Sequence, residues 1–175
     1  MLPLLFWPRF REFLGDILRC SILRSEGESR HPVFSVVVVT IGSIFCYWIW
    51  ARSRGRRSFI EVPAEDWLIA VILMVLVFAV FNALTEEALW RIAPLSLVTP
   101  PYTQAKFVTV GLTQAVSFGL AHYRGFPSGL SGVLLATVFG AVQMATLWYT
   151  RRVWTIIVIH ALVDVGIAWT SFTFV

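Results

Sequence analysis

Five long apolar runs constrain this 175-residue chain more than any other feature of its sequence. They carry almost no formal charge and cover residues 32–51, 67–85, 107–121, 125–150 and 153–175. A helix needs about 20 apolar residues to cross a hydrocarbon core about 30 Å thick. Four of the runs meet that length, and the third falls short alone. We therefore expect an all-α fold, a polytopic transmembrane helical bundle with about five spans.

The composition also favours an integral membrane protein. Hydrophobic residues make up 58% of the chain and charged residues only 14%, against about 25% charged in an ordinary soluble domain. The net charge of +4 comes almost wholly from arginines, which fall between the apolar runs. Lipid headgroups explain arginines in those positions. We therefore expect the lipid bilayer as a partner and no nucleic acid.

The chain is expected to form a single integral membrane domain over residues 1–175. Residues 1–30 place apolar side chains at helical spacing opposite charged ones, which is typical of an interfacial helix at the headgroup level. Residues 67–175 form the core that holds the candidate catalytic groups. The arginines at 52–57 and those of 1–30 fall on opposite sides of one span. The positive-inside rule therefore leaves the orientation open.

Glu86, Glu87 and Arg91 form the first ionisable group beside an apolar run. Glu87 and Arg91 are four residues apart with the acid first, the better order for an ion pair on a helix. Glu86 lies about 100° around the helix from Glu87 and is left free of that arginine. A carboxylate in an apolar pocket can act as a general base toward water. The alternative is that all three form a solvated cap at the membrane surface.

Two histidines lie in apolar helices further along the chain. His122 ends the segment Phe118-Gly119-Leu120-Ala121-His122, and His160 shares a helix face with Asp164. A single histidine on an apolar face is more often a hydrogen-bonded core residue than a ligand. An acid and a histidine four apart within a span are harder to explain in that way. Ionisable groups inside a membrane are costly and tend to be functional.

The three groups read, in order, Glu-Glu-x-x-x-Arg, Phe-x-x-x-His and His-x-x-x-Asp. Over about Ala83 to Val165 the chain resembles the CPBP family, the CAAX proteases and bacteriocin-processing enzymes. The resemblance implies an intramembrane endopeptidase acting on a membrane-associated protein or peptide. It also implies a role for each matching residue: Glu86 activates water, Glu87 and Arg91 support it, His122 helps to hold the water, and His160 and Asp164 stabilise the oxyanion.

The resemblance leaves the catalytic type open. We favour a glutamic-type protease without a cofactor, and a metalloprotease is the alternative. Glu86, His122 and His160 would make a plausible three-ligand zinc site, although the absence of His-Glu-x-x-His argues against an ordinary zincin. The family has asparagine or aspartate at the position of Asp164. An aspartate could donate to an oxyanion only if protonated, so Asp164 could instead orient His160.

The chain departs from the family pattern in being short and in carrying Ile92 where a glycine is common. Its loop Gly125-Phe126-Pro127-Ser128-Gly129 resembles that of short bacterial members thought to process proteins with C-terminal sorting signals. That likeness implies such a protein as substrate and the bacterial inner membrane as the location. Two other functions stay open: a non-catalytic scaffold or bacteriocin-immunity protein, and a small proton-coupled transporter.

The helix positions of Glu86, His122 and His160 predict different depths in the membrane for the three side chains. At about 1.5 Å per residue, Glu86 falls near the far end of the second span and His160 about 10 Å below the same surface. His122 closes the returning helix and should lie toward the opposite surface. They can meet only if residues 123–129 enter the membrane, which backbone does where it lines a protein cavity. We therefore expect a polar cavity at that place.

Overall fold

The structure is a computed structural model that describes residues 31–53, 60–62, 68–97 and 103–174. The expected interfacial segment 1–30 lies outside the described residues. The described elements are, in chain order, α2 (Pro32–Ser53), β1 (Ile60–Val62), α3 (Leu68–Glu87), the π-helical turn η1 (Ala88–Ile92), α4 (Ala93–Ser96), α5 (Gln104–Ala121), the 3₁₀ turn η2 (His122–Arg124), α6 (Gly129–Thr150), α7 (Val153–Ser171) and β2 (Phe172–Phe174).

Among the described residues, four helices are long and apolar enough to cross a membrane: Pro32–Ser53, Leu68–Ser96, Gly129–Thr150 and Val153–Thr170. This confirms an all-α membrane bundle and an integral membrane protein. The expected fifth span, α5, does not reach that hydropathy, because its 18 residues include Gln104, Lys106 and Gln114. The last apolar run leaves the helix at Ser171. Residues 172–174 form a short parallel ladder with β1.

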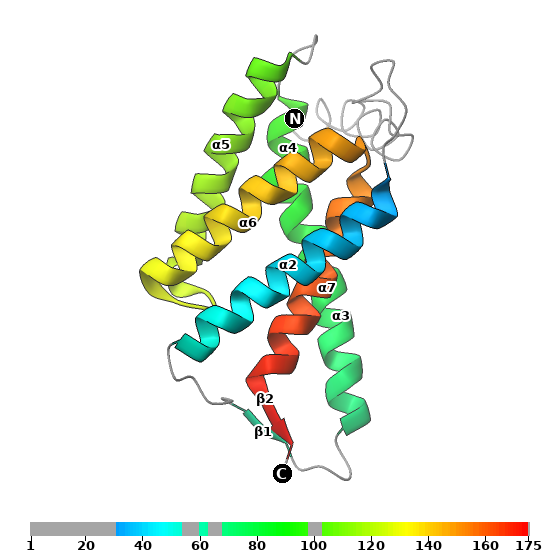
Figure 1. Cartoon of the computed structure of the whole chain (residues 1–175), viewed down its shortest axis with the longest axis vertical. Coiled ribbons are helices and arrows are strands. Elements are labelled where there is room, and N and C mark those ends of the chain that lie inside the picture. Colours follow the sequence, from blue (N-terminus) through cyan, green and yellow to red (C-terminus); the bar gives the residue numbers. More distant parts are fainter. Residues whose placement is uncertain (1–30, 54–59, 63–67, 98–102, 175) are drawn as a thin grey trace, which may run out of the picture.

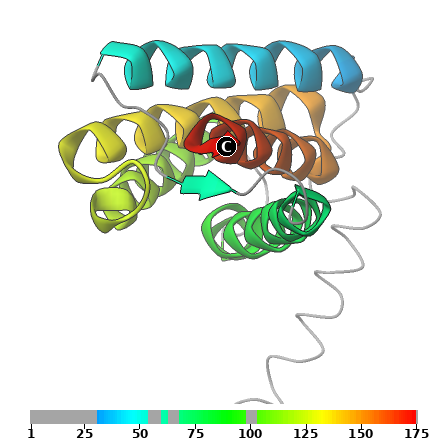
Figure 2. The ribbon, with the colours of Figure 1, turned by 90° about the horizontal axis from the view of Figure 1, so that it is seen from below.

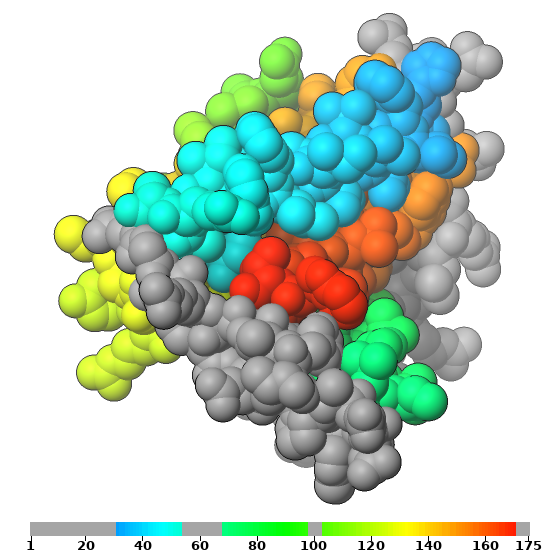
Figure 3. Space-filling view, turned by 60° about the horizontal axis from the view of Figure 1, so that its bottom comes forward, coloured from blue at the N-terminus to red at the C-terminus, as the bar shows by residue number. Residues whose placement is uncertain are grey.

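The helices form three layers when the bundle is viewed along its long axis (Figure 2). The first layer is α2, the middle one holds α6 and α7, and the third holds α5 and α3. Helix α2 packs across α7 and α6, α3 packs on α7, and α5 packs on α6 (Figure 1). Large apolar side chains are exposed on the outer faces, as in Phe34, Phe81 and Leu134, and the outer face of α2 forms one side of the molecular surface (Figure 3). Such faces suit contact with lipid.

Glu86 does not lie near the end of its span, contrary to the expectation from the sequence. Helix α3 continues through η1 into α4, so that one apolar rod runs from Leu68 to Ser96. The Ala93 N–H bonds to the Ala88 carbonyl five residues back, as in a π turn. Pro94 occupies the first turn of α4, where a proline needs no N–H partner. The proline therefore does not end the rod, and Glu86 lies well inside it.

The segment after α5 packs against α6 and lies at the cavity that also holds Glu86. A Cβ atom on Gly132 would collide with the Pro127 carbonyl oxygen. The glycine therefore lets the 125–128 loop lie directly on α6. Gly125, Phe126 and Pro127 line the same cavity as Glu86 and the two site histidines. The expected approach of this segment to the site is confirmed.

Helices α5 and α6 approach closely because small residues face each other along their crossing. A Cβ atom on Gly140 would lie against Ala115, and one on Gly119 would meet Thr137 and the Val133 carbonyl oxygen. Small residues at helix contacts are typical of membrane bundles. In lipid the hydrophobic effect does not drive helices together, so that close packing of their backbones stabilises the contact instead. This crossing places the C-terminal end of α5, and with it His122, against the start of α6.

Gly119→Ala is expected to destabilise the bundle, because the new methyl group would collide with the backbone of α6. Overpacking of this kind costs about 1–3 kcal/mol. Gly42→Ala on α2 is the matched control, since a Cβ there meets no atom within 4 Å. Thermal denaturation of the detergent-purified variants measures both effects. Equal midpoints for the two variants would contradict close packing at Gly119.

Candidate active site

Glu87 and Arg91 form a buried ion pair where α3 passes into the π-helical turn. The Arg91 guanidinium lies 3.2 Å from Glu87 Oε1, and the two side chains are 1% and 0% exposed. The pairing expected from their spacing is therefore confirmed. The alternative of a solvated surface cap is wrong for this pair, because neither group reaches the surface. A charged pair buried in this way within an apolar bundle is a candidate functional site.

Glu87 also joins α3 to α7 through His160. Its Oε1 atom lies 2.6 Å from His160 Nδ1, and the imidazole is buried. Since a carboxylate only accepts, the Nδ1–H donates to Glu87. The ring is further held edge-on by Phe139, with centroids 5.2 Å apart. Glu87 thus sets the orientation of His160, a function that the sequence offered to Asp164.

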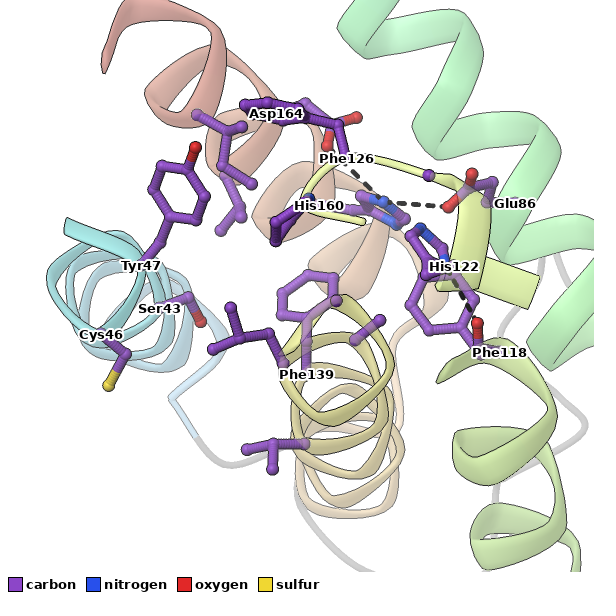
Figure 4. Close-up of a pocket in the computed structure, with 18 of the residues that line it drawn as sticks. Ser43, Cys46, Tyr47, Glu86, Phe118, His122, Phe126, Phe139, His160 and Asp164 are labelled. Carbon is purple, nitrogen blue, oxygen red and sulfur yellow. Dashed lines mark hydrogen bonds and ion pairs between the residues drawn. The ribbon is translucent and has the colours of Figure 1, made fainter. Parts of the chain in front are cut away.

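The other ring nitrogen of His160 faces two acids at the cavity. His160 Nε2 lies 3.4 Å from Glu86 Oε2 and 3.8 Å from Asp164 Oδ1. Glu86 comes from α3 and Asp164 from α7, one turn beyond His160 (Figure 4). The side chain of Glu86 is 24% exposed, whereas that of its neighbour Glu87 is fully buried. Adjacent glutamates thus have opposite environments, one inside an ion pair and one open to the cavity.

His122 reaches the same cavity from the end of α5. The residue caps that helix, and its Nδ1 atom donates to the Phe118 carbonyl oxygen at 2.8 Å. Its ring packs against the Phe118 ring with centroids 4.3 Å apart. These contacts fix the tautomer, because a carbonyl accepts only from a protonated nitrogen. Nε2 of the neutral ring is then an acceptor for a hydrogen of water.

The cavity has a volume of about 610 Å³ and lies among α2, α3, α6 and α7 (Figure 4). Ionisable groups occupy one end, and Ser43 and Tyr47 of α2 add hydroxyls at the opposite wall. Most of the remaining wall is apolar and includes Val39, Leu135, Phe139, Val142, Val163 and Ile167. The expected polar cavity therefore exists in a different form, with one polar end and apolar walls.

The sequence reasoning missed Asn82. Its Nδ2 donates to Asp164 Oδ2 at 3.0 Å, and both side chains line the cavity. A signal was available, because Asn82 is the only asparagine in the chain and lies one helical turn before Glu86 in an apolar run. The contribution of α2 to the cavity was missed as well. No sequence pattern marks it, because Gly42, Ser43 and Cys46 are ordinary residues of an apolar helix.

The arrangement of possible ligands bears on the zinc alternative. Within the part of the chain that the structure describes, no group of three or more His, Cys, Asp and Glu residues could hold a metal ion. Glu86 and His160 lie close together, and the Nδ1 bond of His122 to a backbone carbonyl leaves Nε2 of that ring available as an acceptor or a ligand. Glu86, His122 and His160 are not grouped as a three-ligand site in the described part of the chain.

These features define an integral membrane protein with a buried acid–histidine site that opens on a cavity inside the bundle. A sequence model of the type II CAAX prenyl endopeptidase Rce1-like family matches residues 68–166, more than half of the chain. The chain belongs to this family, which supports a membrane protease of the CAAX endopeptidase type. The matched segment contains all six candidate catalytic residues. No curated protein and no solved structure matches the chain.

Arg91→Met is expected to destabilise the protein more than the double change Glu87→Gln/Arg91→Met. The single change leaves a buried carboxylate without its cation, and breaking a buried pair in this way costs about 3–5 kcal/mol. Thermal denaturation in detergent measures both variants, with the exposed Arg52→Met as the control for loss of an arginine. A double variant less stable than Arg91→Met would contradict a charged pair at Glu87.

Proposed function

We propose that this chain is an intramembrane endopeptidase in which Glu86 activates the water that attacks a peptide bond. The observation that carries the proposal is the contrast between two adjacent acids. Glu87 is engaged by Arg91 and His160, whereas Glu86 opens onto the cavity 3.4 Å from His160 Nε2. A carboxylate placed in this way can take a proton from water next to a bound substrate.

The other side chains have complementary functions in the proposed reaction. Glu86 takes a proton from water, the hydroxide adds to the carbonyl carbon, and the proton passes to the departing amine. His122, whose Nδ1 is held by the Phe118 carbonyl, accepts a hydrogen from the water and helps to aim it. His160, when its ring is charged, donates Nε2–H to the oxyanion, and Glu87 at Nδ1 stabilises that charge. Preorganised donors of this kind often lower the reaction barrier more than any other single effect.

The cavity favours an apolar substrate segment. The apolar wall, which includes Val39 and Val142, can bind apolar side chains of a substrate, while the peptide bond to be cut lies at the polar end. We propose a membrane-anchored protein as the substrate, and one with a C-terminal sorting signal in a bacterial inner membrane is the first candidate. The proposed chemistry needs no metal ion.

Glu86→Gln is expected to stop the reaction, because a carboxamide of the same size cannot take a proton from water. Membrane proteomics compares four strains of the source organism: wild type, a deletion, Glu86→Gln and Thr85→Val. Thr85 is the adjacent, outward-facing residue of α3 and serves as the control. We expect the deletion and Glu86→Gln to accumulate one uncut precursor and Thr85→Val to process it. A Glu86→Gln strain that matches wild type, beside a deletion that does not, would support the scaffold function.

Dialysis against EDTA is expected to leave the activity of the purified protein unchanged, because the proposed water activation depends on a carboxylate alone. The measurement is the rate of precursor cleavage before and after dialysis and after addition of Zn²⁺. A zinc protease dialysed in parallel shows that chelation was effective. Loss of activity that zinc restores would instead favour the metalloprotease alternative.

A further inference from the structure

Helices α3 and α7 carry two polar pairs at the cavity, one helical turn apart. The first joins Glu86 to His160, with Oε2 and Nε2 3.4 Å apart. The second joins Asn82 to Asp164, with Nδ2 donating to Oδ2 at 3.0 Å. Each helix supplies one member of each pair, four residues from the other. The second pair is therefore placed beside the reacting groups by the same helix contact that builds the first.

The hydrogen-bond direction in the second pair separates the functions of its members. Asp164 accepts from Asn82, so it needs no proton for this contact, and an ionised carboxylate cannot donate to an oxyanion. His160 donates from Nε2 only when its ring is charged, because Glu87 takes the Nδ1 hydrogen. A carboxamide nitrogen carries two hydrogens at every pH of interest. Asp164 takes one of those of Asn82, which leaves the second for another acceptor.

The position of Asn82 suits a substrate carbonyl. Residues four apart on a helix have Cβ atoms about 5–6 Å apart. A water on Glu86 can therefore attack a carbonyl carbon whose oxygen lies at Asn82. Both side chains line the same cavity, and Asp164 restricts rotation of the carboxamide. Fixed donors aimed at the developing charge need no reorganisation during the reaction.

We propose that Asn82 is a further catalytic residue, which donates its second Nδ2 hydrogen to the oxygen of the attacked carbonyl as the oxyanion forms. In this arrangement Asp164 is a positioning residue that holds the carboxamide. The inference rests on the proposed peptidase function. It goes beyond that function because it adds a neutral oxyanion donor, Asn82, on the same helix as the base Glu86 and one turn away from it.

The test measures the rate of precursor-to-product conversion by pulse-chase, with the precursor that accumulates in the deletion strain as the probe. The strains carry Asn82→Leu, Asp164→Ala, the double change, or Thr85→Val as control. Asn82→Leu is expected to slow conversion about 10²–10³-fold, the usual effect of removing an oxyanion donor. The midpoint of thermal denaturation, measured on the purified variants, should stay near that of wild type. Asn82→Ala repeats the test with a smaller side chain if the leucine variant does not fold.

The double change separates donation to substrate from mere orientation of Asp164. If Asn82 donates to the carbonyl, the double variant converts precursor more slowly than Asp164→Ala alone. Equal rates for those two variants would overturn the inference, as would an Asn82→Leu strain that converts at the wild-type rate. A fall in rate matched by loss of folded protein in both Asn82 variants would also overturn it. Equal conversion in wild type and Glu86→Gln would instead overturn the peptidase function itself.

Discussion

The buried carboxylate of Glu87 is the contact on which the rest of the site depends. An ionised acid inside an apolar bundle is tolerated only where it is paired and hydrogen-bonded. Glu87 is paired and hydrogen-bonded through its Oε1 atom, with Arg91 at 3.2 Å on the same apolar rod and His160 at 2.6 Å on α7. This double contact fixes the rotation of α3 against α7. Since Glu86 is the next residue around the helix, the same rotation turns it toward the cavity.

The ion pair also organises α5 and α6, two helices that carry none of the acids facing His160. The Arg91 guanidinium lies over the Phe118 ring of α5, 4.2 Å from its centroid, a favourable contact for a cation. A Cβ at Gly140 of α6 would lie 3.4 Å from the same guanidinium, at van der Waals distance, so α6 packs directly against it at this position. The Phe118 carbonyl in turn accepts from His122. One buried arginine thus contacts Glu87 and, through Phe118, is connected to His122 at the cavity.

The sequence predicts the membrane bundle and the Glu87–Arg91 pair and indicates six candidate site residues, because charge-free runs and ionisable groups inside them are local signals. It could not predict that the helix of Glu86 continues beyond Pro94, since a proline usually interrupts a helix and the π turn before it has no sequence signal. The bond from Glu87 to His160 spans 73 positions, and no local spacing reveals it. Asn82 was overlooked because a single amide in an apolar helix becomes meaningful only when Asp164 is seen opposite.

In the proposed function, chemistry and substrate selection fall on different parts of the chain. The family match over 68–166 contains every ionisable group at the polar end of the cavity. The wall opposite belongs to α2, which lies outside that match and contributes Val39, Gly42, Ser43, Cys46 and Tyr47. A Cβ at Gly42 meets nothing within 4 Å, so larger side chains there would shorten the cavity without disturbing the catalytic groups. The buried pair therefore restricts α3 and α7, whereas α2 takes no part in it. In the proposed function, changes in α2 would alter which substrates are accepted and leave the reaction the same.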